Sequence, residues 1–321
     1  MHEPTPTSFS VAAASDPVSS PDAPIPGAPP ASAFVAVIAA NIALGFGPWF
    51  VRLADTGPVA AGFWRITLAI PVLVAFAVAS GARPTRLAPS LWLVLIGGGI
   101  FFAADLASWH LGILRTTLGN ATLFGNSATL IFPIYGFLVA RAWPTRVQAL
   151  ALALAALGGG LLMGRSYQLD PRHLAGDLLC LLAGLLYAVY FIAMSRARDV
   201  MAPLPALALS TIASALPLLV FAWMLGERIA PQDWTALIAL ALVSQIIGQG
   251  LMIYALGRLP PLVIGIALLV QPMVGATLGW IEYDERLGLI DLVGGGLVAA
   301  ALVLVRRGRV APALAREQEQ A

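Results

Sequence analysis

Ten long apolar stretches, separated by short polar breaks, fill the chain from about residue 34 to residue 307. A helix needs about 20 consecutive apolar residues to cross the hydrocarbon core of a bilayer, because each residue adds about 1.5 Å. The pattern therefore predicts an all-α polytopic membrane protein with ten transmembrane helices. We expect these helices at 34–52, 59–80, 91–111, 118–139, 147–164, 176–195, 206–225, 234–256, 262–281 and 288–306.

The second five stretches repeat the pattern of the first five. Arg115 corresponds to Arg258 at a spacing of 143 residues (258 − 115 = 143), and Thr129 corresponds to Pro272 at the same spacing. Because each half has an odd number of spans, the second copy must be upside down relative to the first. We therefore expect two inverted five-helix repeats, at 34–165 and 176–307. Alternating-access carriers have this architecture, with a site between the halves near the membrane midplane.

Composition and charge narrow the class and orient the chain. Only 11% of the residues are charged and the mean hydropathy is +0.87, whereas about 25% of a soluble domain is charged. Residues 1–33 and 308–321 lack long apolar blocks and are predicted to be disordered tails. All 18 basic residues are Arg, and most lie on the side that holds both termini. The positive-inside rule then predicts that both termini are cytoplasmic.

One polar face runs along the predicted span 118–139. Gly119, Thr122, Asn126, Thr129 and Pro133 recur at steps of three or four, which places them on one side of a helix. A polar group facing lipid is unfavourable, so such a face turns toward a cavity or another helix. Thr122 and Asn126 are therefore candidate substrate-binding residues, and hydrogen bonding between helices is the alternative.

Glutamines and prolines mark the later spans. Gln245 and Gln249 lie one turn apart in 234–256, and Gln271 directly precedes Pro272. All three glutamines are candidates for the transport path. Gln271 has the alternative role of satisfying the Leu268 carbonyl, which Pro272 leaves unpaired. A proline inside a helix also bends it, and we predict hinges at Pro48, Pro133, Pro217 and Pro272.

Asp105 is the only acidic residue well inside a predicted span. An intramembrane carboxylate suggests a counter-ion for a substrate ammonium, or a proton relay. Trp109 lies one turn later on the same face, and His110 is turned about 100° away. Both are candidate binding residues, with interface anchoring of Trp109 and structural hydrogen bonding of His110 as the alternatives.

Other aromatic and basic residues extend this picture. Tyr187 and Tyr190 share a face near the middle of 176–195, where they would bind a substrate or pack between helices. Arg65 falls inside the span 59–80. We expect its long side chain to extend to the outer headgroups.

The chain resembles the drug/metabolite transporter (DMT) superfamily, in its ten-helix EamA-type branch, over residues 34–307. The motif of that branch is matched in the second half by Ala255-Leu256-Gly257-Arg258-Leu259, then Pro272, then Glu285-Arg286. In the first half Thr129 and Ala142 stand where Pro and Glu are usual. The Trp109-His110 pair and the aromatic richness are most similar to aromatic amino-acid exporters of the YddG type. The resemblance implies transport activity, a multi-pass location in the bacterial inner membrane, and no cofactor.

These observations favour a carrier that exports amino acids, aromatic and large apolar ones above all, by passive facilitated diffusion. The alternative is a DMT-type exporter of cationic drugs or other metabolites, proton-coupled through Asp105. An enzyme is not expected, because paired intramembrane aspartates, His-Glu-x-x-His and Gly-x-Ser-Gly motifs are all missing. A channel would need rings of charged or carbonyl groups. The expected partners are a small-molecule substrate and the lipid bilayer, without nucleic acid, cofactor or metal. One copy of the chain could suffice, since it contains both repeats.

Overall fold

The computed structural model describes residues 30–81, 87–116, 124–164, 171–283 and 288–307, and the regular elements in these ranges are all helices. Six helical segments are long and apolar enough to cross a membrane, and four shorter apolar helices accompany them. The predicted class, an all-α polytopic membrane protein, is confirmed. The first half contains α1 (Ala31–Gly45), α2 (Gly47–Leu53), α3 (Pro58–Ala79), α4 (Pro89–Ile113), α6 (Ala128–Ala140) and α7 (Arg146–Gly164).

The second half opens with a single 3₁₀ turn, η2 (Pro171–His173), which leads into its first long helix. Its elements are α8 (Leu174–Arg198), α9 (Pro203–Met224), α10 (Thr235–Ala239), η3 (Leu240–Gln249), α11 (Gly250–Leu256), α12 (Pro261–Leu268), α13 (Val270–Tyr283) and α14 (Leu289–Arg307). Local sequence explains where many helices begin. Proline is the first residue of α3, α4, α9 and α12, where its missing N–H would have had no helical partner.

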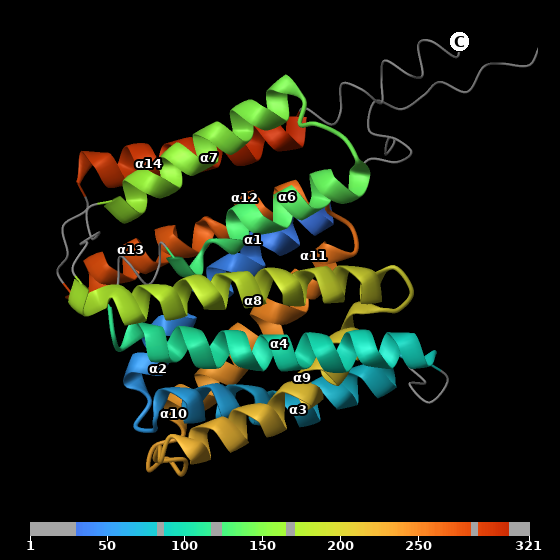
Figure 1. Cartoon of the computed structure of the whole chain (residues 1–321), viewed down its shortest axis with the longest axis vertical. Coiled ribbons are helices and arrows are strands. Elements are labelled where there is room, and N and C mark those ends of the chain that lie inside the picture. Colours follow the sequence, from blue (N-terminus) through green and yellow to red (C-terminus); the bar gives the residue numbers. More distant parts are fainter. Residues whose placement is uncertain (1–29, 82–86, 117–123, 165–170, 284–287, 308–321) are drawn as a thin grey trace, which may run out of the picture.

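Side by side, the helices form rows that run across the molecule (Figure 1). α7 and α14 pack together at one edge, and α3 and α9 lie together near the opposite edge. Between them α4 packs along α8, α6 along α12, and α1 along η3 and α11. Each of these contacts joins a helix from before residue 165 to one from after residue 173, so the two halves of the chain are interleaved.

Proline and glycine bring α6 and α12 into close contact. A Cβ atom at Gly265 would lie 2.4 Å from Pro133 Cγ, and a Cβ atom at Gly136 would lie 2.8 Å from Pro261 Cβ. The order of the two contacts is reversed along the two helices, so α6 and α12 run antiparallel. Membrane helices approach this closely when small residues line the interface. Gly275 on α13, by contrast, has open space around it.

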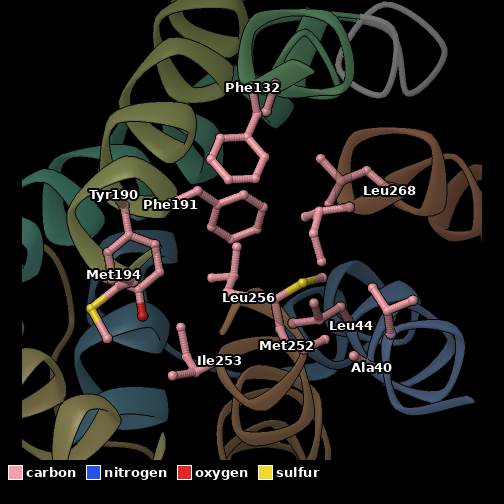
Figure 2. Close-up of a cluster of buried hydrophobic side chains, with 14 of the residues drawn as sticks. Ala40, Leu44, Phe132, Tyr190, Phe191, Met194, Met252, Ile253, Leu256 and Leu268 are labelled. Atoms are coloured by element: carbon pink, nitrogen blue, oxygen red, sulfur yellow. The ribbon is translucent and has the colours of Figure 1, made fainter. Parts of the chain in front are cut away.

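A buried apolar cluster joins α6, α8, α11 and α12 near the centre of the molecule (Figure 2). Phe132 and Phe191 meet edge to face with ring centroids 5.4 Å apart. Tyr190 and Met194, further along the same side of the cluster, are fully buried. Between helices in lipid, such association depends on close van der Waals packing.

Several predicted spans are interrupted where the sequence analysis expected one continuous helix. α1 gives way to α2 at Phe46, just before Gly47-Pro48, and α12 gives way to α13 at Leu269. Pro272 accounts for the second break, because it cannot donate to the carbonyl four residues earlier. In the span predicted at 118–139, Asn126 and Ser127 form a turn before α6. The predicted polar face is therefore not one uninterrupted helical face.

The span predicted at 234–256 departs from α geometry in its middle. Its residues Leu240–Gln249 form a π-helix, in which each backbone hydrogen bond spans five residues instead of four. π-Helices are rare and are frequently found at functional sites. This segment contains Gln245 and Gln249, the two glutamines that the sequence analysis selected.

At one end of the molecule, the loop before α3 is bound to the loop before α10. Gly57 N donates to Arg228 O at 3.0 Å, and Asp55 and Arg228 form a salt bridge of 3.8 Å. Trp64 Nε1 donates to Ile229 O at 2.7 Å. These contacts join the two halves of the chain at this end.

Glu227, in the same loop, accepts a hydrogen bond of 2.8 Å from Ala60 N in the first turn of α3. Its negative charge also stabilises the positive end of the helix dipole. We expect Glu227→Ala to lower the free energy of unfolding by about 1 kcal/mol, measured by thermal unfolding of the detergent-solubilised protein. Glu282→Ala, at an exposed site on α13, is the control. Equal effects of the two substitutions would contradict the capping role.

Candidate functional site

Arg65 on α3 lies at the centre of the site. Its side chain is only 5% exposed, and its Nε donates to Gln245 Oε1 at 3.1 Å. The guanidinium carbon lies 5.8 Å from the centroid of the Phe102 ring. The expectation that Arg65 extends to the headgroups is therefore wrong. The physical reason is that Gln245 and Phe102 give the guanidinium a polar and an aromatic partner inside the protein.

The two glutamines of the π-helix bind different partners. Gln245 is fully buried, and its Nε2 donates to Thr211 Oγ1 on α9 at 3.2 Å. Gln249 Nε2 donates to the Tyr187 hydroxyl on α8 at 3.1 Å. Among the described residues, Gln249 Oε1 has no hydrogen-bond partner although it is buried. Both candidates thus connect the π-helix to neighbouring helices, and Gln245 also fixes Arg65.

Aromatic rings from α4 and α8 line the site. Phe102 stacks on Tyr190 with centroids 4.5 Å apart and on Tyr187 with centroids 6.2 Å apart. Tyr187 also lies 4.2 Å from the Phe191 ring. The structure therefore brings Tyr187 and Tyr190 together with Phe102, a residue that the sequence analysis did not select. Stacked rings of this kind offer a flat apolar surface.

Asp105 lies one turn after Phe102 on α4 and is 8% exposed. It lies near Arg65, because the Arg65 guanidinium contacts the ring of Phe102, one turn earlier on the same helix. In the ranges that the structure covers, Asp105 makes no salt bridge and no hydrogen bond. We call Arg65, Phe102, Asp105, Tyr187, Gln245 and Gln249 the central cluster.

The central cluster lies well inside the helices that supply it. Asp105 is eight residues before the end of α4 at Ile113, which corresponds to about 12 Å along the axis. Arg65 is seven residues after the start of α3 at Pro58, or about 10 Å. Both charges thus lie far from the ends of spans that measure about 30 Å.

Trp109 and His110 lie beyond this cluster, near the end of α4. His110 Nδ1 lies 2.6 Å from the carbonyl oxygen of Pro58, within hydrogen-bonding distance. His110 Nε2 is buried without a partner among the described residues. The Trp109 indole packs against Gly125, where an added Cβ would lie 3.0 Å from Nε1. These contacts tie α4 to α3 and to the turn before α6.

The remaining polar candidates are spread over other contacts. Asn126 lies in the turn before α6, is half-buried and has an interaction partner. Thr122 lies outside the described residues. Gln271 Nε2 donates to Asn41 Oδ1 on α1 at 2.8 Å, and Asn41 Nδ2 donates to Val37 O at 2.7 Å. Gln271 thus binds a side chain of another helix, whereas the alternative reading assigned it to the Leu268 carbonyl.

The four candidate hinges occupy two kinds of position. Pro48 and Pro272 lie beside the helix breaks at Phe46 and Leu269. The other two prolines lie inside continuous helices, Pro133 in α6 and Pro217 in α9. Their role as hinges stays a prediction.

The sequence analysis did not assign four residues to the buried contacts in which the structure places them. They are Arg65, Phe102, Asn41 and Thr211. Arg65 had a signal, because it is an arginine placed well inside an apolar span, and such residues mark functional sites. Asn41 had a similar signal as an amide within an apolar stretch. Phe102 and Thr211 had none, since a single phenylalanine or threonine in a membrane helix is ordinary.

The fold and the central cluster together define a class of protein. Helices from both halves of the chain surround a buried cation, a buried carboxylate, amides and aromatic rings, with both ionisable groups about 10 to 12 Å from a helix end. Ionisable groups buried inside membrane-spanning helices mark substrate or ion pathways. Among the described residues, His, Cys, Asp and Glu form no group that could hold a metal ion. The molecule is thus a polytopic membrane protein with a buried cluster of polar and aromatic residues between its helices, an arrangement typical of transporters.

Comparison with known proteins agrees with this class. Residues 174–307 match the model of the EamA-like transporter family. The chain is 23% identical over 274 residues to an uncharacterized transporter of Archaeoglobus fulgidus, covering 85% of this chain and 95% of that one. It is 26% identical over 242 residues to the threonine/homoserine exporter RhtA of Escherichia coli, covering 74% of this chain and 78% of that one.

A solved crystal structure has the same fold, with a TM-score of 0.73 at 15% identity, and the match covers 85% of this chain and 96% of that one. The sequence similarities support the predicted relationship to EamA-like transporters of the DMT superfamily. They also agree with the prediction that the chain is a transporter and not an enzyme. The more specific similarity to aromatic amino-acid exporters is not addressed by them.

Proposed function

We propose that the chain exports amino acids across the bacterial inner membrane, with aromatic and large apolar side chains favoured. The observation that supports this most directly is the central cluster, where Arg65 and Asp105 lie buried beside the stacked rings of Phe102 and Tyr187. An aromatic amino acid has a carboxylate, an ammonium and a ring, and the cluster offers a group of matching chemistry for each. The name of the relative RhtA, an amino-acid exporter, points in the same direction.

The mechanism that we propose is alternating access between two inverted repeats, at 34–165 and 176–307, with both termini cytoplasmic. The packing supports it, since α4 lies along α8 just as η3 and α11 lie along α1. Each repeat thus packs its first helical segments against the third span of the other. The central cluster takes residues from both repeats, so rocking of one against the other would open and close it. Passive facilitated diffusion is the mode that we expect.

Hinge motion in this mechanism would use the interrupted helices. The breaks beside Pro48 and Pro272 lie in the first span and the ninth span, where α1 contacts α13. The hydrogen bond between Asn41 and Gln271 joins these two spans. Bending at the prolines would change that contact, and with it the opening between the repeats.

Counterflow of labelled phenylalanine in proteoliposomes tests this function. We expect saturable counterflow that tryptophan and methionine inhibit more strongly than threonine, because the aromatic wall formed by Phe102 and Tyr187 favours large apolar side chains. Empty liposomes provide the background. If a cationic dye, but no amino acid, were exchanged, and a pH gradient drove its accumulation, the proposal would be wrong. The proton-coupled drug exporter would then be the better description.

A further inference from the structure

Resting on the proposed function, we propose that the central cluster is a site for zwitterions. In it, the two terminal nitrogens of Arg65 bind the substrate carboxylate, and the Asp105 carboxylate binds the substrate ammonium. The site would therefore bind small molecules that carry an ammonium and a carboxylate group on the same carbon atom. It would not bind molecules that carry only one of these two groups.

Arg65 has hydrogen-bond donors left for a ligand. A guanidinium has five N–H groups in a planar fork, which matches a carboxylate with two parallel hydrogen bonds. Here Nε donates to Gln245, and within the described part of the chain this is the hydrogen bond that Arg65 makes. Its terminal nitrogens are thus left for another acceptor, although the side chain is only 5% exposed. A buried cation of this kind is strongly unfavourable without an anionic partner.

The Asp105 carboxyl group has hydrogen-bond acceptors left for a ligand. An ionised carboxylate only accepts hydrogen bonds, and this one receives none from the described residues. The Arg65 guanidinium lies 5.8 Å from the ring centroid of Phe102, which is one turn before Asp105 on α4. Arg65 and Asp105 therefore lie near each other, but they do not form a salt bridge. A ligand with an anionic and a cationic group could lie between them and satisfy both.

The planar guanidinium of Arg65 is held in place by neighbouring side chains. Gln245 accepts from Arg65 and donates to Thr211, so the fork is held through a chain of two hydrogen bonds. The Phe102 ring also contacts the guanidinium, with its centroid 5.8 Å from the guanidinium carbon. Gln245 and Thr211 are thus positioning residues, and Arg65 is the binding residue.

The aromatic wall completes the site on the Asp105 side. Phe102 lies one turn before Asp105 on α4 and stacks on Tyr187. The Tyr187 hydroxyl accepts from Gln249, and the stacked rings of Tyr187 and Phe102 form an apolar surface next to the Arg65 guanidinium. A substrate bound to both charges would therefore place its side chain beside these rings.

Analogues that lack one charge test this proposal on the wild-type protein. Phenethylamine lacks the carboxylate and 3-phenylpropionate lacks the ammonium, but both keep the ring. We expect each to inhibit phenylalanine counterflow at least about 100-fold more weakly than unlabelled phenylalanine, because each leaves one buried charge unpaired. If either analogue inhibited as well as phenylalanine, the zwitterion site would be wrong while amino-acid export would stand.

Two variants test which residue binds the substrate carboxylate and which binds the substrate ammonium. Arg65→Gln should raise the half-saturating concentration of phenylalanine at least about 100-fold and bring the inhibition ratio of phenylalanine to phenethylamine close to one. Asp105→Asn should do the same for the ratio of phenylalanine to 3-phenylpropionate. A merely structural role would weaken all ligands together and leave these ratios unchanged. Arg196→Gln, on an exposed part of α8, is the matched control, and Arg65→Lys keeps the charge if Arg65→Gln fails to fold.

Ligand-induced thermal stabilisation in detergent separates this proposal from the transport function. If wild type showed no counterflow but phenylalanine stabilised it and neither analogue did, the zwitterion site would stand without the export function. If phenylalanine neither exchanged nor stabilised the protein, both proposals would be wrong.

Discussion

Replacing Gln245 by Leu should reduce the initial rate of phenylalanine counterflow about 100-fold. The change removes the acceptor of Arg65 Nε and the donor to Thr211 while keeping an apolar side chain of similar size. Hydrogen bonds to charged groups contribute about 1.5–3 kcal/mol each, and the freed guanidinium would no longer be held in one orientation. The rate should be measured at low phenylalanine concentration with equal amounts of reconstituted protein.

Gln249→Leu is the matched comparison, because it lies in the same π-helix and loses a hydrogen bond between uncharged groups. Such a bond contributes about 0.5–1.5 kcal/mol, so we expect a loss of about tenfold or less. Gln245→Glu should stay closer to wild type than Gln245→Leu, because it keeps an acceptor for Arg65. Equal losses in Gln245→Leu and Gln249→Leu would show that Arg65 does not depend on Gln245.

Replacing Gly265 by Ala should destabilise the protein although it adds only one methyl group. That methyl would lie 2.4 Å from Pro133 Cγ and 2.7 Å from the carbonyl oxygen of Thr129. Backbone and a proline ring cannot move aside cheaply, so α6 and α12 must separate. Overpacking of this kind typically costs about 1–3 kcal/mol. The thermal unfolding temperature in detergent should fall by several degrees.

Gly296→Ala provides a control with the same chemical change. A Cβ at Gly296 on α14 meets no atom within 4 Å, and alanine is a better helix former than glycine by about 1 kcal/mol. We therefore expect opposite shifts of the unfolding temperature in the two variants. Shifts of the same sign would contradict the close contact between α6 and α12.

The positions of the spans could be predicted well because apolar length is a direct consequence of the bilayer thickness. The span expected at 59–80 is α3 (Pro58–Ala79), and the span expected at 206–225 is α9 (Pro203–Met224). The interruptions were only partly visible. Gly47-Pro48 and Pro272 are local signals, whereas no proline marks the π-helix Leu240–Gln249.

The site was harder to predict because helix rotation and partner choice depend on tertiary packing. Gln245 and Gln249 were selected correctly as inward-facing, since two amides one turn apart cannot both face lipid. Arg65 was assigned to the membrane surface, because the sequence contains no information on what lies beside it. Its partners Gln245 and Phe102 are 180 and 37 residues away in the chain (245 − 65 and 102 − 65). Only the packing of α3 against η3 and α4 brings these residues together.

The π-helix has a consequence for the equivalence of the two halves. Each of its backbone hydrogen bonds encloses one residue more than in an α-helix, so the same residues form a wider and shorter coil. If the ten residues of Leu240–Gln249 returned to α geometry, this span would become longer and Gln245 would rotate relative to the residues after Gln249. In the proposed repeats the corresponding helix is α4, which is α-helical from Pro89 to Ile113 and holds no such reserve of length. Of these two spans, only the one that contains η3 can lengthen in this way.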